Sequence, residues 1–166
     1  SEGPIDLSAW FPPERQGLPL ELEIGSGKGT FLVAYAQQQP AINLIGLEWA
    51  KAYYRYAADR CRRHSLDGVR LVRAEAAMFL RQYVPDQTLR QVHIYHPDTW
   101  PKARHQKRRL IQARWLKELH AKLQPVDEAD PQRGVVRITT DHADYFAWIE
   151  AAVAEVADWF DRLAFE

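Results

Sequence analysis

Two kinds of hydrophobic pattern alternate along the chain. Short runs rich in Leu, Ile and Val predict five strands, at residues 20–24, 43–48, 69–73, 91–95 and 135–139. Longer stretches with helical periodicity predict helices, at residues 30–39, 50–66, 76–83, 110–123 and 145–160. Residues 96–106 and 124–134 show neither pattern and are expected to form loops.

This regular alternation of strands and helices predicts an α/β fold. Parallel strands need crossover connections, and right-handed crossovers place helices against the sheet. We therefore expect a mostly parallel sheet with helices on both faces. The 166 residues suffice for one hydrophobic core, so residues 1–166 are expected to form a single domain. In such folds, ligands bind beyond the carboxyl ends of the strands.

The composition indicates a soluble globular protein, with 46% hydrophobic and 27% charged residues. No apolar run approaches the roughly 18 residues that a membrane span needs, and the amino terminus lacks the pattern of a signal peptide. A cytoplasmic protein that does not bind membranes is therefore expected. The single cysteine, Cys61, has no metal-ligand spacing around it, and no metal is expected. The sequence does not choose between a monomer and a homodimer.

A glycine-rich turn, IGSGKG, follows the first predicted strand. Gly25 and Gly27 would let the backbone approach a ligand closely. Gly29 comes two residues after Gly27, whereas the dinucleotide-binding pattern needs three, and Glu23 precedes the turn. This spacing favours an adenosyl group that carries an amino acid over a pyrophosphate. An ordinary tight turn is the alternative.

Two further acids follow the next two predicted strands. Glu48 lies 21 residues after Gly27, where a carboxylate can accept hydrogen bonds from ribose hydroxyls. Glu75 could bind an adenine amine. The alternatives are a solvated acid at a strand end for Glu48, and an acid that stabilises a helix amino terminus for Glu75.

The fourth predicted strand leads into HPDTWPKARHQKRR, where Asp98 lies between two prolines that stiffen the loop. The chain has 22 basic and 22 acidic residues, yet no acid follows Asp98 until Glu118. This local charge favours a polyanion such as nucleic acid, and a solvated helix face is the alternative. The basic residues are Lys102, Arg104, His105, Lys107, Arg108 and Arg109.

HPDTWPKARHQKRRL, together with LEIGSGKG and TTDHADY, resembles the bacterial tRNA (guanine-N7)-methyltransferases. Their signature is close to F-P-D-P-W-x-K-x-R-H-x-K-R-R, and the resemblance extends over residues 20–148. It implies a Rossmann-like class I methyltransferase fold with S-adenosylmethionine as the methyl donor. It also implies that N7 of a guanine in the variable loop of tRNA is the methyl acceptor.

The matching positions imply a role for each candidate residue. Asp98 would be catalytic and would also line the cofactor site. Lys102 and Asp141 would contact the substrate, and Asp141 could at the same time be the N-cap of a helix. The basic residues from Arg104 to Arg109 would hold the RNA. The remaining cofactor-binding residues would be Glu23, Gly25, Gly27, Glu48 and Glu75.

The sequence departs from the family pattern at His96, Thr99 and Glu75, where phenylalanine, proline and aspartate are usual. The family also continues beyond DRLAFE through a T-x-x-E segment and the last strands of the sheet, so those strands are expected to be missing from this chain. Two other functions remain open. One is a non-catalytic RNA-binding protein with this fold, and the other is a methyltransferase that acts on a different RNA.

Overall fold

The computed structural model describes residues 3–163, and this part of the chain forms a five-stranded parallel sheet in the order β3-β2-β1-β4-β5. The strands are β1 (Leu20–Ile24), β2 (Asn43–Leu47), β3 (Val69–Val72), β4 (Leu89–Tyr95) and β5 (Val135–Thr139). The α-helices are α1 (Thr30–Gln38), α2 (Lys51–Arg63), α3 (Ala76–Tyr83), α4 (Ala113–Lys122) and α5 (Ala143–Ala154). Three short 3₁₀ helices complete the fold, η1 (Leu7–Trp10), η2 (Pro13–Arg15) and η3 (Ala103–Arg108).

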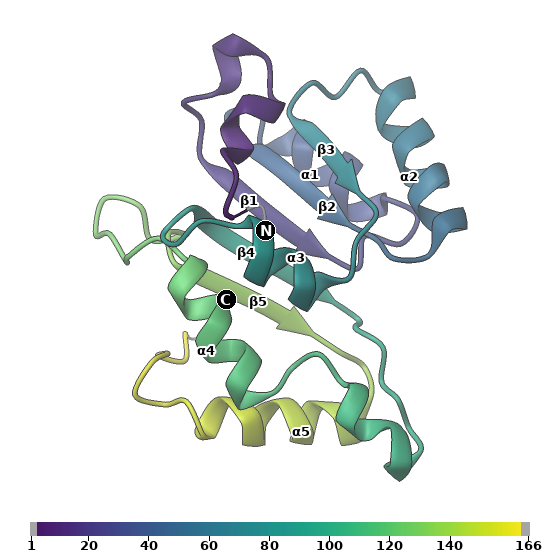
Figure 1. Ribbon diagram of the computed structural model, residues 1–166, viewed down its shortest axis with the longest axis vertical. Helices are drawn as coiled ribbons and strands as arrows, with labels where there is room; N and C mark the ends of the chain where they lie inside the picture. The colour runs from purple at the N-terminus through teal and green to yellow at the C-terminus, as the bar shows by residue number, and fades with distance from the viewer. Residues whose placement is uncertain (1–2, 164–166) are drawn as a thin grey trace.

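Helices cover both faces of the sheet, as predicted (Figure 1). One buried cluster joins the sheet to α1 and α2, and it contains Leu44 and the single cysteine, Cys61. A larger cluster joins the sheet to η1, α3, α4 and α5, and it contains Ile45. Because neighbouring residues of a strand point to opposite faces, Leu44 and Ile45 place the two clusters on opposite sides of the sheet.

The chain changes direction across the sheet between β1 and β4. From β1 it proceeds outward through β2 to β3, and it then returns past β1 to β4 and β5. The strands are all parallel, so their carboxyl ends lie together on one side of the sheet, which is called the carboxyl edge below (Figure 1). The crevice expected for a ligand in such a fold lies at this edge, between β1 and β4.

Some predicted boundaries were wrong. The helix expected at residues 110–123 begins only at Ala113, and the loop expected at residues 96–106 contains most of η3. The helix expected at residues 145–160 begins earlier and ends at Ala154. The sequence pattern also missed η1 and η2, although Leu7 and Phe11 are buried in the larger cluster. Such short 3₁₀ segments show no helical period that could reveal them.

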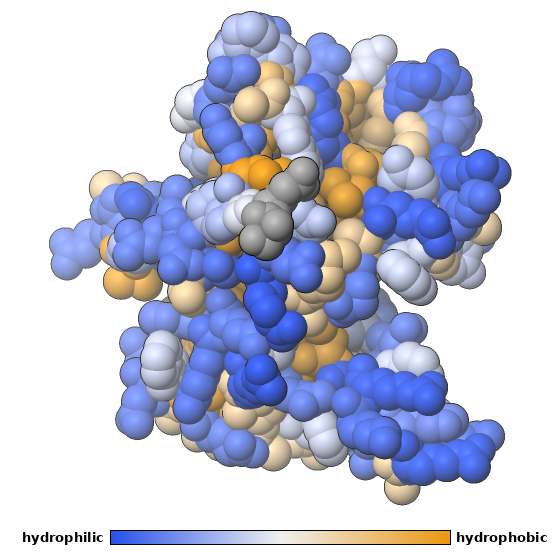
Figure 2. Space-filling model, viewed as in Figure 1, coloured by the Kyte–Doolittle hydropathy of each residue, from blue (hydrophilic) through white to orange (hydrophobic). Residues whose placement is uncertain are grey.

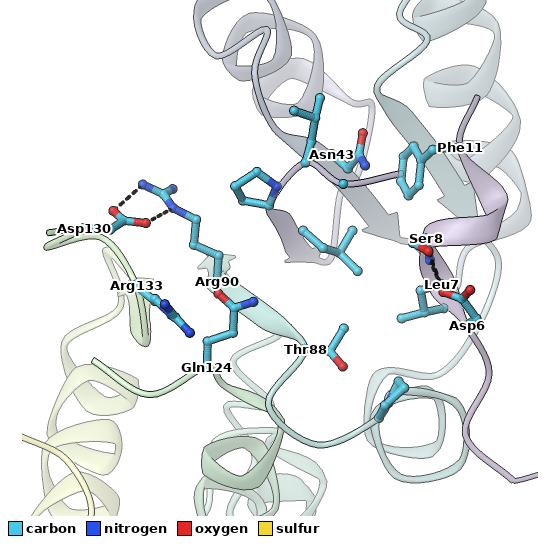
Figure 3. A pocket seen from close by; sticks show the side chains of 15 residues that line it. Asp6, Leu7, Ser8, Phe11, Asn43, Thr88, Arg90, Gln124, Asp130 and Arg133 are labelled. Carbon is cyan, nitrogen blue, oxygen red and sulfur yellow. Dashed lines mark hydrogen bonds and ion pairs between the residues drawn. The ribbon is translucent and has the colours of Figure 1, made fainter. Parts of the chain in front are cut away.

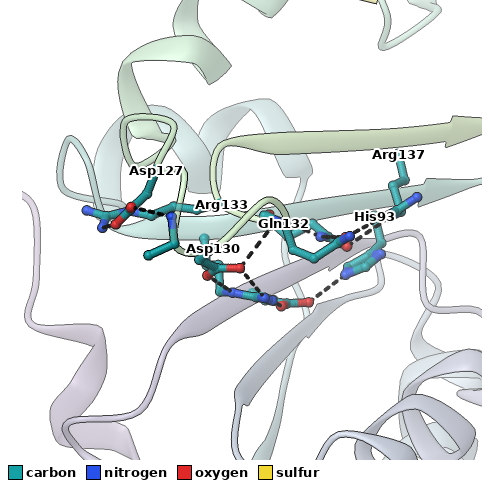
Figure 4. Close-up of polar contacts among 10 residues, drawn as sticks. His93, Asp127, Asp130, Gln132, Arg133 and Arg137 are labelled. Carbon is teal, nitrogen blue, oxygen red and sulfur yellow. Dashed lines mark hydrogen bonds and ion pairs between the residues drawn. The ribbon is translucent and has the colours of Figure 1, made fainter. Parts of the chain in front are cut away.

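Several polar side chains of the sheet and of the loop before β5 are paired with one another (Figure 4). Glu21 is fully buried in β1, with Oε2 2.7 Å from His93 Nε2 and Oε1 bonded to Arg90. Arg90 also donates to both oxygens of Asp130, at 2.6 and 2.8 Å. Burial would by itself raise the pKa of the Glu21 carboxyl, but the bonds from His93 and Arg90 hold that pKa below its ordinary value. Glu21 is therefore a structural acid, held ionised inside the sheet.

Candidate functional site

The three glycines after β1 adopt left-handed backbone conformations, with φ of 79° at Gly25, 52° at Gly27 and 72° at Gly29. A Cβ added at Gly25 or Gly27 would meet no atom within 4 Å, so these two positions border open space. A Cβ at Gly29 would lie 2.9 Å from Cβ of Ala57 in α2. The first two glycines thus leave the backbone open to a ligand, and the third allows α2 to pack against the turn.

Glu48 ties this turn to the start of α2. Its Oε2 accepts from the Gly27 amide at 2.8 Å, and its Oε1 accepts from the Ala50 amide at 2.7 Å. The side chain is 9% exposed, so the alternative prediction, a solvated acid at a strand end, is wrong. Each carboxylate oxygen has a second lone pair, which leaves room for a hydroxyl donor. Its contact with a ribose stays a prediction.

Glu23 is a buried acid with an unpaired oxygen. It is 3% exposed, and its Oε2 has no hydrogen-bond partner among the described residues. The neighbouring Ser26 hydroxyl is also buried without a partner there. Burial raises the pKa of the Glu23 carboxyl, the Ser26 hydroxyl lowers it and the Glu48 carboxylate raises it, with a net value of about 7. Glu23 and Ser26 therefore present polar groups that a bound ligand could satisfy.

Glu75 is the N-cap of α3. Its two oxygens accept from the Ala77 and Met78 amides at 2.9 and 2.7 Å. The helix-stabilising alternative is therefore confirmed, and a contact with adenine stays a prediction. Glu75 also lines a cavity of about 300 Å³ together with Lys107 and Arg108. The structure thus brings one predicted cofactor residue close to two predicted RNA contacts.

Asp98 lies in the exposed loop that follows β4. It makes no side-chain hydrogen bond or ion pair with any residue between 3 and 163. Two non-glycine residues with left-handed backbones flank it, His96 with φ of 50° and Trp100 with φ of 44°. Such conformations cost about 1–3 kcal/mol each and persist only where the surroundings enforce them. The loop is therefore held in a specific shape around a free carboxylate.

Arg109 connects the Asp98 loop to helix α5. Its side chain is 1% exposed, and its Nε donates to the Thr99 carbonyl at 2.7 Å. The guanidinium also pairs with Asp144 and lies 4.8 and 5.0 Å from the ring centroids of Tyr145 and Trp148 in α5. Its guanidinium is almost fully buried and already has partners, which does not favour the predicted contact with phosphate, and that contact stays a prediction.

The other predicted RNA contacts differ in exposure. Lys102, Arg104, Lys107 and Arg108 are exposed. His105 is half-buried, with its ring 6.0 Å from the Trp100 ring, and the Arg108 guanidinium lies 5.1 Å from the same ring. Trp100 therefore anchors η3 to the Asp98 loop. The exposed surface of residues 102–108, which follow β4 in the chain and include η3, is called the β4 basic segment below.

Asp141 lies beside the same loop, with its carboxylate 3.4 Å from Nδ1 of His96. The side chain is 88% exposed, so it remains open to a substrate. The prediction that Asp141 also caps a helix was wrong by one residue. His142 is the N-cap of α5, and its Nδ1 accepts from the Tyr145 amide.

A cavity of about 420 Å³ lies at the opposite edge of the sheet, by the amino ends of β1, β2 and β4 (Figure 3). Its walls include Asn43, Thr88 and the paired residues Arg90 and Asp130. None of the predicted site residues lines it.

Across residues 3–163, no group of three His, Cys, Asp or Glu side chains is placed to hold a metal ion. No helix in this range is long and apolar enough to cross a membrane.

Comparison with known proteins decides the family. Residues 18–163 match a family model described as "Putative methyltransferase". The chain belongs to this methyltransferase family. The resemblance seen in the sequence is therefore confirmed at the level of the family.

Curated relatives of this chain are named tRNA (guanine-N(7)-)-methyltransferase. The protein from Corynebacterium glutamicum is 38% identical over 149 residues, which cover 90% of this chain and 55% of that protein. The protein from Nitrosomonas eutropha is 37% identical over 145 residues, which cover 87% of this chain and 60% of that protein. The chain thus spans little more than half the length of these relatives.

Solved structures confirm the predicted Rossmann-like class I methyltransferase fold. Precorrin-6y C5,15-methyltransferase from Geobacter metallireducens matches with a TM-score of 0.58 and 17% identity, over 85% of this chain and 63% of that one. PKMT2 from Rickettsia typhi, solved in complex with AdoHcy, matches with a TM-score of 0.50 and 18% identity, over 69% of this chain and 20% of that one. At these identities the match shows a shared fold.

Replacing Arg109 with lysine is expected to destabilise the protein by about 2 kcal/mol, because lysine cannot reproduce the fork of donors or stack between two rings. Urea unfolding measures this loss. Arg108→Lys is the matched control, since Arg108 is exposed and its replacement should change the free energy of unfolding by less than about 0.5 kcal/mol. Equal losses in the two variants would show that Arg109 does not brace the loop.

Proposed function

We propose that this chain forms one S-adenosylmethionine-dependent methyltransferase domain that methylates N7 of a guanine in the variable loop of tRNA, in the cytoplasm. The observation that carries the proposal is the position of Asp98. It is an exposed carboxylate with no side-chain partner within residues 3–163, just beyond the carboxyl end of β4. This strand lies next to β1 and its open glycine turn, and the β4 basic segment follows Asp98 in the chain. The names of the curated relatives support the same function.

The residues at the edge of the sheet fit S-adenosylmethionine. Its amino acid carries an ammonium group, which would pair with the unpartnered carboxylate of Glu23. Its ribose hydroxyls would donate to the free lone pairs of Glu48, and Gly25 and Gly27 leave open space where the ligand would lie. Glu75 would lie by the adenine. When bound, this cofactor supplies an electrophilic methyl group on a sulfonium.

The proposed reaction needs no general base. N7 of guanine carries an in-plane lone pair and no hydrogen, so no proton would have to be removed before the methyl group is transferred from sulfur to N7 and S-adenosylhomocysteine is left. The protein must instead align the acceptor with the methyl group, a contribution that reaches about 7–11 kcal/mol in favourable cases. Asp98 would accept hydrogen bonds from the N1 and N2 hydrogens of an extruded guanine. Its charge would also stabilise the positive charge that develops on the methylated base.

The β4 basic segment would hold the RNA backbone. Its exposed cations would contact phosphates, which fix the position of an RNA without reading its sequence. Asp141, exposed beside the Asp98 loop, would contact the same substrate. Arg109 would contribute only by supporting the loop, since it is buried.

The expected result of incubating the protein with unmodified tRNA and methyl-labelled S-adenosylmethionine is label at one guanine of the variable loop, as 7-methylguanine. The control is the same tRNA with that guanine replaced by adenine, which should take up no label. Binding of both ligands without any label would favour a non-catalytic RNA-binding protein. Label in another RNA of a total RNA sample, but not in tRNA, would favour a methyltransferase that acts on a different RNA.

A further inference from the structure

Helix α2 carries a second basic and aromatic surface, far from the β4 basic segment in the sequence. Its residues, KAYYRYAADRCRR, include five cations and one acid. Tyr53 is 48% exposed and Tyr56 is 50% exposed. Residues three apart on a helix are neighbours on its surface, so the two tyrosines lie on the same side of α2. The name α2 face is used below for Lys51, Tyr53, Arg55 and Tyr56.

Helix stability does not explain the cations of the α2 face. Lys51 is the first residue of α2, where the positive end of the helix dipole favours acids, and the first turn contains no acid. Neither Lys51 nor Arg55 forms an ion pair within residues 3–163. Towards the end of the helix, in contrast, Arg62 and Arg63 both pair with Asp59, at 2.8 and 2.9 Å. Arg60 donates to the Thr30 hydroxyl at 3.0 Å, so Lys51 and Arg55, in the same two turns as the exposed tyrosines, are the cations of α2 that bond to no side chain within residues 3–163.

A third exposed ring extends this surface towards the candidate site. Trp49 is 63% exposed, and the Arg73 guanidinium lies 5.5 Å from its ring centroid. Arg73 also donates to the Trp49 carbonyl at 3.2 Å. Trp49 follows Glu48, the residue that bonds to the glycine turn, so the α2 face begins at the carboxyl edge of the sheet.

The α2 face and the β4 basic segment border this edge from opposite sides. In the sheet, β2 and β3 lie on one side of β1 and β4 lies on the other. Figure 1 shows α2 and the segment before α4 at the two ends of the side to which the strands point. Figure 2 shows strongly hydrophilic residues gathered in both places. A substrate that reached Asp98 could therefore continue onto either surface.

We propose that the α2 face binds unpaired nucleotides of the RNA substrate, with bases stacked on Tyr53 and Tyr56 and phosphates held by Lys51 and Arg55. Exposed aromatic rings interleaved with cations are the arrangement by which proteins hold single-stranded nucleic acid. The inference rests on the proposed function, because it names a second contact of the same RNA. The RNA would then contact two surfaces of the protein, the α2 face and the β4 basic segment, on opposite sides of the strand ends that carry the candidate site.

Two pairs of replacements test the stacking. The Y53L/Y56L variant keeps apolar side chains but removes both rings, and it is expected to weaken the binding of unmodified tRNA at least about tenfold. The Y53F/Y56F variant keeps the rings and should bind within about twofold of the original protein. Both variants should retain the thermal midpoint and the affinity for S-adenosylhomocysteine, because neither tyrosine is buried.

The charges are tested by salt dependence. The K51Q/R55Q variant is expected to reduce the slope of log affinity against log salt by about 1.4, the value for two fewer contacts with single-stranded phosphates. The matched control is R62Q/R63Q, which removes two cations already paired with Asp59 and should change the slope less.

Several outcomes would overturn the inference. Unchanged tRNA affinity in Y53L/Y56L would exclude stacking, and equal weakening in Y53F/Y56F would assign the contact to the hydroxyl groups. Intact tRNA binding with a changed mass of the protein in solution would make the α2 face a protein contact. If the original protein binds tRNA without methylating it, the proposed function fails while the binding test still decides this inference. If it binds no tRNA, both fail.

Discussion

Replacing Asp98 with asparagine is expected to lower the rate of methyl transfer at saturating tRNA about 100-fold, while tRNA binding changes little. Asparagine has nearly the same size but carries no charge and has only one acceptor oxygen. It would therefore lose one of the two hydrogen bonds to the guanine and the stabilisation of its developing charge. Single-turnover measurement of 7-methylguanine gives the rate, and equilibrium binding gives the affinity.

The matched control is Asp86→Asn, because Asp86 is also an exposed acid but pairs with Lys122 away from the carboxyl edge. This variant should methylate at the original rate. A loss of tRNA affinity as large as the loss of rate in Asp98→Asn would make Asp98 a binding residue with no special part in the transition state. A full rate in Asp98→Asn would remove it from the mechanism altogether.

Much of the fold could be predicted because the strands and several helices are marked by local residues. The strand at residues 20–24 ends at a glycine turn, and α3 has the same bounds in the prediction and in the structure. The start of α4 could not be predicted in this way. Residues 110–112 fit a helical period, yet they are not helical, and side chains of α5 bond to the backbone of Ile111 instead. The Trp148 indole donates to the Ile111 carbonyl at 2.7 Å, a tertiary contact that no local pattern reveals.

The candidate site shows the same division between local and distant information. The sequence indicates which side chains follow which strand, and the parallel sheet then brings these strand ends to one edge. It treats Arg108 and Arg109 alike, since both belong to one basic run. The structure separates them because Tyr145 and Trp148, from a later helix, enclose only Arg109. The one local signal is that Arg109 directly precedes the apolar pair Leu110 and Ile111.

Glu21 and Glu23 show why a strand pattern cannot assign roles to its acids. They are two residues apart in β1 and both are buried, yet their carboxylates differ in partners. His93 and Arg90 satisfy Glu21, whereas Oε2 of Glu23 has no partner within residues 3–163. Those partners come from β4, so only the assembled sheet distinguishes the structural acid from the acid available to a ligand.

Replacing Glu23 with glutamine is expected to stabilise the ligand-free protein and, at the same time, to weaken its binding of S-adenosylhomocysteine. The pKa of Glu23 is raised from an ordinary value of 4.5 to about 7, so the folded state holds this proton more tightly than the unfolded state does. The resulting stability is fully present below pH 4.5 and is lost as the pH rises through 7. The loss amounts to about 3 kcal/mol in the original protein and should be absent in Glu23→Gln.

The opposite effect on the ligand makes the test specific. At pH 8 the ionised Glu23 would pair with the ammonium of S-adenosylhomocysteine, so we expect Glu23→Gln to bind it roughly 100-fold more weakly, as calorimetry would measure. At pH 6 the two proteins should differ less, because Glu23 is then largely protonated. Glu21→Gln is the matched control, and it should instead lose about 3–5 kcal/mol of stability by leaving buried partners unpaired. If Glu23→Gln lost stability in the same way, Glu23 would be a structural acid like Glu21, and the site for the amino acid part of the cofactor would have to lie elsewhere.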